Sequence, residues 1–308
     1  MDRERFSGIY PMQFAFFDAA GRLDRAAMRR QVQACLAGGA HGVACLGLGT
    51  EVGKLSNAER RSVVDWITGD VAGRIPVAVT VAGASVEEQV ALGEYAGAAG
   101  ASWLILQPPP QRGLPEAYYA DFFAQVMERV DLPCAIQNAP EYLGVGLGPA
   151  AIAELARRVR NFVLLKGEGP ALTIRRAIEA AGDALAVFNG RGGLELIDNL
   201  RAGCAGVIPA TDTFDYQVRI YEAMRGGDQA AAEVVYREVL PAIVFIMQSL
   251  EQFLCYGKRI AAWRLGLVEV YDRAPALAPE AFGLECARRY AQALGPLRSR
   301  YSEGFNAT

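Results

Sequence analysis

The sequence predicts an α/β protein, a (β/α)8 TIM barrel followed by a C-terminal helical extension. Short apolar runs of about four to six residues alternate with amphipathic stretches of about 10–15, a pattern typical of βα units and a parallel sheet. After residue 226 the pattern becomes purely helical. We therefore predict a barrel domain over residues 1–226 and a helical extension, packed on the barrel, over residues 227–308.

The barrel prediction rests on strict alternation of strands and helices. The expected strands are 9–14, 42–47, 76–81, 103–107, 133–137, 162–166, 184–189 and 206–209. The expected helices are 24–38, 57–72, 85–99, 115–130, 148–158, 170–181, 192–202 and 213–226, with 228–255, 256–268 and 279–296 in the tail. Ser85 with Glu88 three residues later, and Pro115 and Pro149 at first turns, are typical helix starts. A doubly wound sheet would show the same alternation, but no G-x-G-x-x-G opens the first unit.

Composition argues against several classes of protein. Hydrophobic residues make up 52% of the 308 residues and the net charge is −3, without a basic patch that would bind nucleic acid. The N-terminus lacks the apolar core of a signal peptide, and no apolar stretch is long enough to span a membrane. Six scattered cysteines without a C-x-x-C pair favour a reducing cytoplasm. A single histidine, His41, argues against a catalytic metal site, and we expect no cofactor.

Lysine is rare among the positively charged residues of this chain. Of the 31 lysines and arginines only three are lysines, namely Lys54, Lys166 and Lys258. A desolvated lysine can lose its proton and act as an amine nucleophile, which an arginine cannot do. Lys166 ends the apolar run FVLL inside the expected barrel. Its position alone is equally consistent with a strand-end cation paired with Glu168.

Functional side chains of a parallel barrel project from the carboxyl ends of its strands. In this chain those ends carry Gln13, then Gly47, Leu48, Gly49, Thr50 and Glu51, then Gln107, Gln137 and Asn138, Lys166 and Glu168, Asn189, Gly190 and Arg191, and finally Ile208. The candidate site therefore combines one amine, two carboxylates and several amides.

Four segments resemble the dihydrodipicolinate synthase/N-acetylneuraminate lyase family of Schiff-base barrels, in matching order and spacing. They are CLGLGTEVGKLSNAER, LPCAIQNAP, VLLKGEGP and FNGRGGLELIDNLRAGCAGVIPA. The resemblance implies a barrel with a helical tail, usually a homotetramer, and a small 2-oxo acid as substrate. It also implies that Lys166 is the lysine that forms the imine.

Departures from the family pattern indicate the branch. Gln137 stands where the family has a proton-relaying tyrosine, and residues 138–142 lack the arginine that meets the second substrate's carboxylate in the synthase. Leu48 and Gly49 replace a hydroxyl pair, and Thr50 replaces a glycine. These changes make dihydrodipicolinate synthesis, in which pyruvate condenses with an aldehyde, the alternative and not the favoured activity. They resemble the branch that dehydrates 2-keto-3-deoxy sugar acids, such as L-2-keto-3-deoxyarabonate. Dehydration and aldol cleavage of a sugar acid both stay open.

Within that branch the residues receive expected roles. Lys166 forms the imine, Glu168 acts as acid and base or simply pairs with the lysine, and Gln137 holds a substrate hydroxyl or a water. The backbone N–H groups of residues 47–50, aided by Thr50, cradle the substrate carboxylate. Asn189 and Arg191 contact distal hydroxyls, Gly190 belongs to the substrate-binding site, and Ile208 walls the pocket.

Three further charged residues are expected to have structural roles, and two other kinds of function stay open. Glu51 is expected to be a structural acceptor, and Lys54 and Lys258 are expected to be solvated or to pair on helices. A phosphate-binding barrel that uses NGRGG, and a non-catalytic homologue that binds oxo acids, stay open as alternatives.

Overall fold

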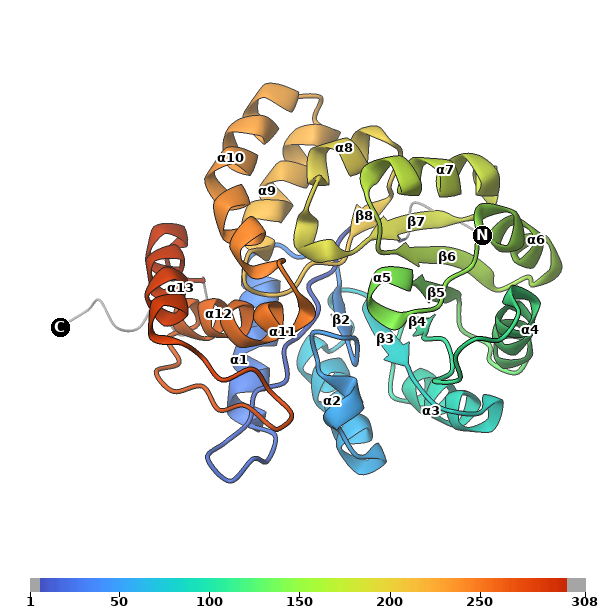
Figure 1. The fold of residues 1–308 in the computed structure, drawn as a ribbon, viewed down its shortest axis with the longest axis horizontal. Coiled ribbons are helices and arrows are strands. Elements are labelled where there is room, and N and C mark those ends of the chain that lie inside the picture. Colours follow the sequence, from blue (N-terminus) through green and yellow to red (C-terminus); the bar gives the residue numbers. More distant parts are fainter. Residues whose placement is uncertain (1–5, 298–308) are drawn as a thin grey trace.

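The computed structural model describes residues 6–297, which form a barrel of parallel strands surrounded by helices (Figure 1). The strands are β1 Gly8–Ile9, β2 Val43–Cys45, β3 Val77–Val81, β4 Trp103–Leu106, β5 Cys134–Asn138, β6 Phe162–Gly167, β7 Ala186–Asn189 and β8 Gly206–Val207. Residues 1–5 of the predicted barrel domain and 298–308 of the predicted extension lie outside the described residues.

The strands are hydrogen-bonded in the order β1-β8-β7-β6-β5-β4-β3-β2, and every pair is parallel. The segment after β1 closes the barrel against β2. The Gln13 amide donates to the carbonyl of Ala44 (2.8 Å), and the Ala44 amide donates to the carbonyl of Pro11 (3.0 Å). The predicted fold class is therefore confirmed.

A helix follows each strand on the outside of the barrel. These helices are α1 Arg25–Ala37, α2 Asn57–Val71, α3 Val86–Ala98, α4 Glu116–Met127, α6 Pro149–Arg158, α7 Ala171–Ala181, α8 Leu196–Arg201 and α9 Phe214–Arg225. Each overlaps its predicted range. Ser85 caps α3 by accepting a hydrogen bond from the Glu88 amide (3.2 Å), as the sequence predicted.

Three local predictions were wrong at their edges. The first and last strands are shorter than expected because Pro11 and Pro209 have no N–H to donate to a ladder. The predicted helix 192–202 begins only at Leu196, since residues from Arg191 to Glu195 include positive φ angles that no α-helix accommodates. A short helix, α5 Pro140–Leu143, was not predicted.

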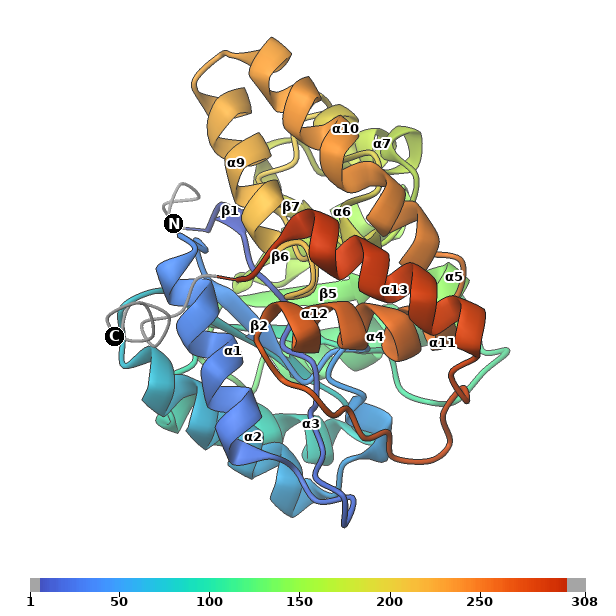
Figure 2. The same ribbon diagram turned by 90° about the vertical axis from the view of Figure 1, so that its left-hand side faces the viewer.

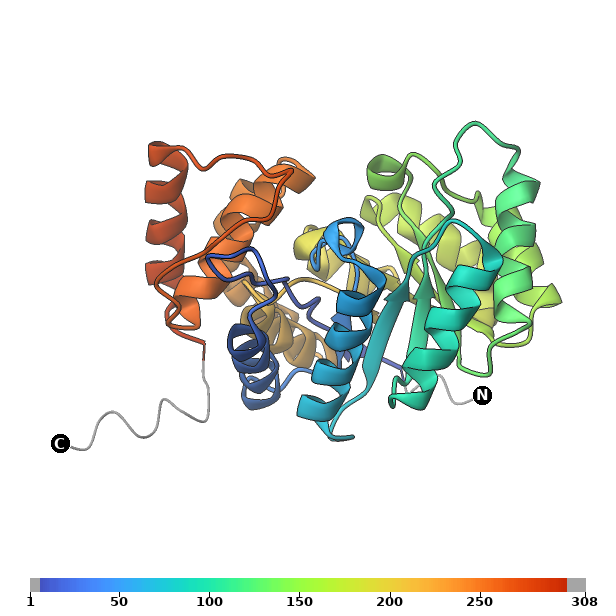
Figure 3. The same cartoon turned by 90° about the horizontal axis from the view of Figure 1, so that it is seen from below.

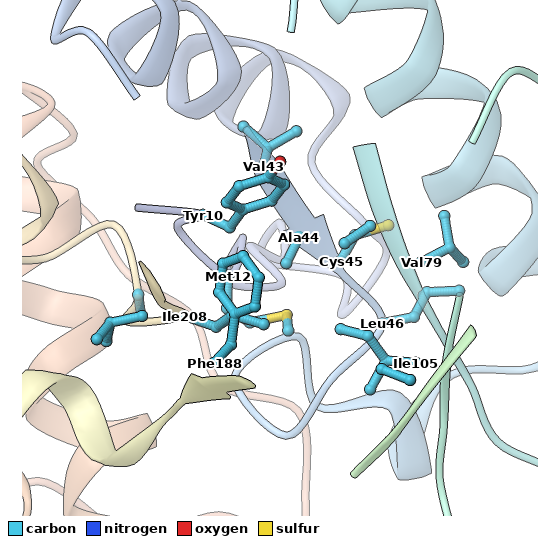
Figure 4. Close-up of a cluster of buried hydrophobic side chains, with 14 of the residues drawn as sticks. Tyr10, Met12, Val43, Ala44, Cys45, Leu46, Val79, Ile105, Phe188 and Ile208 are labelled. Carbon is cyan, nitrogen blue, oxygen red and sulfur yellow. The ribbon is translucent and has the colours of Figure 1, made fainter. Parts of the chain in front are cut away.

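Aromatic side chains fill the barrel interior. The Tyr10 ring lies 5.3 Å from that of Phe188 and 5.7 Å from that of Trp103, measured between ring centroids. Figure 4 shows Tyr10, Met12 and Phe188 grouped beside β2. The interior is therefore a packed core, and active sites of such barrels lie at the carboxyl ends of the strands.

The tail adds further helices beside the barrel (Figures 2 and 3). They are α10 Gln229–Ile246, α11 Leu250–Gln252, α12 Lys258–Arg264 and α13 Ala281–Leu294, with a π-helical segment Phe253–Gly257 joining α11 to α12. The prediction of one helix over 228–255 was wrong, because Ser249 caps a new helix by accepting from the Gln252 amide (3.1 Å).

The tail is fastened to the barrel by an ion pair. The Arg264 guanidinium donates through Nη1 and Nη2 to the two carboxylate oxygens of Asp215 on α9, at 2.9 and 2.6 Å. The division of the chain at residues 226 and 227 stays a prediction, although α9 ends at Arg225 and α10 begins at Gln229. No helix within residues 6–297 has the length and apolar character needed to cross a membrane.

Candidate active site

The site begins with Lys166, at the carboxyl end of β6. The strand FVLLKG carries this amine into the barrel, where the residue is only 4% exposed. Lys166 Nζ lies 2.6 Å from Oε1 of Glu168, which is also buried. Glu168 therefore faces the same interior as Lys166, and the two form a close ion pair.

Gln137 on β5 is the direct neighbour of Lys166 in the sheet register. Its Nε2 donates to Oε1 of Glu168 (2.6 Å), and its Oε1 accepts from Nε2 of Gln107 (2.9 Å). The backbone carbonyl of Gln107 accepts in turn from Gln89 (2.9 Å). This chain of amides fixes the orientation of Gln137, so that Glu168 Oε1 faces two donors at once.

A cavity of about 50 Å³ opens in front of Lys166 and Glu168. Ile208 forms part of its wall, as predicted. The tail closes the opposite side with Met247, Leu250 and Phe253, which the sequence did not suggest. The site thus combines a polar floor from the barrel with an apolar cover from residues far along the chain.

Leu48 and Gly49, in the turn after β2, line this cavity. The amides of Thr50 and Glu51 are used inside the turn, donating to the carbonyls of Gly47 (3.1 Å) and Leu48 (3.0 Å). In the described part of the chain nothing accepts from the amides of Leu48 and Gly49. Backbone N–H groups without partners in a turn can bind an anion.

Two predicted members of this turn lie behind it. The Thr50 hydroxyl is fully buried and donates to the carbonyl of Gln13 (2.6 Å), so it supports the turn and does not reach the cavity. A Cβ on Gly47 would lie 2.4 Å from the methyl of Met12, so that this position permits close packing. The expectation that the Thr50 side chain would help to hold the carboxylate has no support in this geometry.

Asn189 was expected to contact a substrate hydroxyl, but its side chain is buried and already satisfied. Its Nδ2 donates to the carbonyl of Gly169 (3.0 Å) and to Asn199 Oδ1 (2.9 Å), and its Oδ1 accepts from the amide of Gly190 (2.8 Å). It is not among the residues that line the cavity. Asn189 therefore holds the loop after β7 in place.

Gly190 lines the cavity directly against Glu168. A Cβ at this position would lie 2.8 Å from Cγ of Glu168, so only glycine leaves room for the carboxylate. The amides of Gly190 and Gly193 donate within the loop, to Gly167 (2.9 Å) and Gly190 (3.3 Å). These two donors are therefore already used, and the phosphate-binding alternative stays a prediction.

Two larger side chains reach the cavity from opposite loops. Arg191 comes from the loop after β7, and Tyr142 comes from α5. Burial raises the pKa of the Tyr142 phenol and the negative charge of Glu168 adds to the rise, while the Arg191 guanidinium beside it opposes the rise. Sequence reasoning missed Tyr142, although Pro140 and Gly144 around it mark a short helix that turns back toward the barrel.

The other two lysines form a separate cluster. Lys54, half-buried, pairs with Glu51 across one helical turn, in line with the expectation, but Lys258 is neither solvated nor paired along its own helix. Lys54 Nζ lies 2.5 Å from Glu51 Oε2. Lys258 is fully buried and donates to Glu51 Oε1 and, at 3.5 Å, to Asp272. Glu51 is a structural acceptor, as expected, and it ties the turn after β2 to the tail.

His41 lies at the entry to β2, as expected. Its Nδ1 accepts from the amide of Ile9 (3.1 Å), and its Nε2 lies 2.6 Å from Glu222. Within residues 6–297 no three His, Cys, Asp or Glu side chains are grouped in a way that could hold a metal ion.

Backbone strain is concentrated around the cavity. Five non-glycine residues among those described have positive φ angles. Leu46 and Glu51 flank the turn after β2, and Arg191 and Glu195 flank the loop after β7; Ala72 ends α2. Strained backbone of this kind tends to cluster at functional sites. The two loops that bring backbone donors and a guanidinium to the cavity are therefore held in specific conformations.

The family model described as the dihydrodipicolinate synthetase family matches residues 5–281. The chain belongs to this family. The resemblance seen in the sequence is thereby confirmed, and since the family's members are class I lyases, the protein is an enzyme of that class.

Curated relatives cover most of the chain. A probable 2-dehydro-3-deoxy-D-pentonate aldolase, YjhH from Escherichia coli K12, is 29% identical over 89% of this chain and 92% of its own length. An L-2-keto-3-deoxyarabonate dehydratase from Azospirillum brasilense is 30% identical over 78% of this chain and 79% of its own length.

Solved structures share the fold. YagE from E. coli K12, a member of the dihydrodipicolinic acid synthase family solved in complex with pyruvate, superposes with a TM-score of 0.86 at 25% identity, over 94% of this chain and 98% of that one. A Pseudomonas aeruginosa protein of the same family gives a TM-score of 0.87 at 25% identity, over 94% of this chain and 99% of that one.

Proposed function

We propose that this protein forms a Schiff base between Lys166 and a 2-oxo acid, and that it dehydrates a 2-keto-3-deoxy sugar acid. The observation that carries the proposal is the buried Lys166–Glu168 pair, 2.6 Å apart, at the wall of a cavity. Relatives named as a sugar-acid aldolase and a sugar-acid dehydratase support the substrate class.

Imine formation follows from the pair itself. Glu168 takes a proton from the Lys166 ammonium across their short contact, which leaves a neutral amine. The amine attacks the C2 carbonyl of the oxo acid and gives a carbinolamine. The Glu168 carboxyl then returns its proton to the C2 hydroxyl, which leaves as water while the C2=N bond forms. The resulting iminium cation is an electron sink next to C3.

Dehydration uses the same carboxylate again. Glu168 removes a proton from C3, and the electron pair moves toward the nitrogen to give an enamine. The enamine then expels the C4 hydroxyl, which takes the proton from Glu168 and leaves as water. Aldol cleavage would instead remove the C4 hydroxyl proton and break the C3–C4 bond. Both routes share the imine, and we favour dehydration because Gln137 stands where the family has a proton-relaying tyrosine.

Other residues position the substrate. The free amides of Leu48 and Gly49 would hold the C1 carboxylate, since backbone donors aimed at an anion stabilise it without reorganisation. Gln137 would keep Glu168 in place through its 2.6 Å hydrogen bond, and Ile208 would wall the pocket. Gly190 would contribute by leaving room for the Glu168 carboxylate.

The decisive experiment is borohydride trapping followed by peptide mass spectrometry. The protein is incubated separately with pyruvate and with 2-keto-3-deoxyarabonate, then reduced. We expect a reduced adduct on the Lys166 peptide, and a mass that shows whether water or a carbon fragment has left. Lys166→Arg is the matched control, because it keeps the positive charge beside Glu168 but cannot form an imine. We expect it to lower turnover by roughly 10⁴-fold or more. Absence of any adduct would exclude the mechanism.

We further propose a homotetramer in the cytoplasm. The tetramer follows from the family resemblance, and light scattering of the purified protein tests it. A reducing compartment is supported by the cysteines, since all six in the described residues are free thiols. Burial raises the pKa of the Cys35 and Cys45 thiols to about 12, which makes them poor nucleophiles.

A further inference from the structure

Arg191 lines the same cavity as Lys166 but has no part in the chemistry proposed above. Its backbone has a φ of 55°, a left-handed conformation that costs energy in a non-glycine residue. Its side chain is only 19% exposed. A strained residue thus holds a permanent positive charge at the edge of the substrate cavity.

The guanidinium is incompletely paired. Among the described residues its Nε is buried and has no hydrogen-bond partner. The carboxylate of Glu141 lies 3.9 Å from this nitrogen, beyond hydrogen-bond distance, and that of Glu195 lies 3.4 Å from Nη1. Both carboxylates are about half exposed, and such surface pairs contribute little. A buried donor without a partner is costly unless a ligand satisfies it.

The cavity therefore has two places for an anion, on different loops. The free amides of Leu48 and Gly49 form one, and Arg191 forms the other. The carboxylate next to the oxo group of a 2-oxo acid needs only one of them. A hydroxyl would not need a guanidinium, whereas a carboxylate matches its planar fork of donors.

We propose that Arg191 binds a second carboxylate at the far end of the substrate, so that the preferred substrate is a 2-keto-3-deoxy sugar acid with a carboxylate at both ends. This inference rests on the proposed imine chemistry and narrows its substrate class. Tyr142, beside Arg191 and also lining the cavity, is placed to contact the same group. Glu141 and Glu195 steer the guanidinium from outside and partly compete with the substrate.

The test compares two substrates that differ only at the far end. These are 2-keto-3-deoxygluconate and its counterpart in which the terminal CH2OH is oxidised to a carboxylate. We expect kcat/KM to be higher for the dicarboxylate by roughly 30-fold or more, the range for a well-desolvated charge pair. Arg191→Gln should abolish this preference mainly through KM, because the interaction lies away from the reacting carbons.

A second variant, Glu141→Gln, should change KM for the dicarboxylate in the opposite direction from Arg191→Gln. Glu141→Gln removes a competing negative charge beside Arg191, so it should lower KM for the dicarboxylate and leave the KM for the monocarboxylate unchanged. A purely structural role for Arg191 predicts no such gain. Equal losses for both substrates in Arg191→Gln, or no improvement in Glu141→Gln, would overturn the inference.

Trapping with pyruvate separates this inference from the proposed function. Pyruvate has no far end, so Arg191→Gln should lower its borohydride adduct far less than it lowers dicarboxylate turnover. If the adduct falls as much, Arg191 binds the C1 carboxylate and the inference is wrong while the imine chemistry stands. If the unaltered protein forms no pyruvate adduct, the proposed function fails and the inference fails with it.

Discussion

Two buried lysine–glutamate pairs stand at the carboxyl end of this barrel, and they have different surroundings. Lys166 contacts Glu168 at 2.6 Å, and a cavity lies in front of both. Lys258 contacts Glu51 and Asp272, and its ammonium lies 5.3 Å from the centroid of the Phe17 ring. The first amine has room for a substrate carbon, whereas the second is enclosed by partners.

If the proposed mechanism holds, burial and a carboxylate partner are not enough to make a lysine reactive. Lys258 is more deeply buried than Lys166, and two carboxylates and an aromatic face surround its ammonium. Its partner Glu51 also binds Lys54, so the cluster joins the turn after β2 to the tail. A reactive amine needs access and a partner that can take its proton, and only the Lys166 pair offers both.

The largest expected effect comes from replacing each of the two lysines, in turn, with methionine. Lys258→Met leaves Glu51 buried with only Lys54 as a partner, and loss of one member of a buried ion pair costs about 3–5 kcal/mol. We expect the free energy of unfolding to fall by this amount, measured by urea denaturation. The folded fraction should still give the borohydride adduct with pyruvate.

Lys166→Met is the matched control for that experiment. Here Glu168 keeps its hydrogen bond from Gln137 and faces a cavity that water can enter, so the loss of stability should be about 1–2 kcal/mol. The adduct should disappear. If Lys258→Met removed the adduct without affecting stability, the roles of the two lysines would be reversed.

A third buried acid, Asp212, differs from both glutamates because, within residues 6–297, no cation pairs with its carboxylate directly. The buried Arg264 guanidinium donates to its backbone carbonyl and only partly offsets the effect of burial on its pKa. Among the described residues its Oδ2 has no hydrogen-bond partner, and burial raises the pKa of Asp212 to about 7. The folded protein therefore holds this proton more tightly than the unfolded chain does. Its contribution to stability is complete below about pH 4 and is lost as the pH rises through 7.

Asp212→Asn should remove that pH dependence. At pH 8 we expect the variant to be more stable than the unaltered protein by about 2–4 kcal/mol, because no charge has to be buried. At pH 4 the two should be alike. Urea denaturation at both pH values measures the difference, and parallel stability curves for the two proteins would contradict this account of Asp212.

The smallest effect concerns the space around Glu168. Gly190→Ala would place a Cβ 2.8 Å from Cγ of Glu168 and displace the carboxylate from Lys166. We expect kcat to fall by about 10- to 100-fold, because small displacements of catalytic groups are costly. Gly69→Ala on α2 is the control, since nothing lies within 4 Å of its added Cβ. Equal activity in the two variants would show that Glu168 does not need its present position.

Much of the fold could be predicted because its signals are local. Apolar runs and amphipathic stretches specify strands and helices directly, and the barrel follows from their alternation. The wrong predictions of strand and helix ends also have local causes. Pro11 and Pro209 shorten strands, and Ser249 starts a new helix where the periodicity continues. These residues act through missing donors or side-chain acceptors, which hydrophobic periodicity does not register.

The sequence by itself determined the barrel, the strand that ends in Lys166, and the position of Glu168 two residues later. In the structure the strand β6 ends at Gly167, so the tertiary structure decided that Glu168 faces Lys166, where Gln137 from β5 also donates to it. The tertiary structure alone decided which lysine is enclosed, because the partners of Lys258 come from the turn after β2 and from the tail. It also brought Tyr142 and Arg191 to one cavity, since which loops meet there depends on barrel closure and tail packing, and local patterns do not specify either.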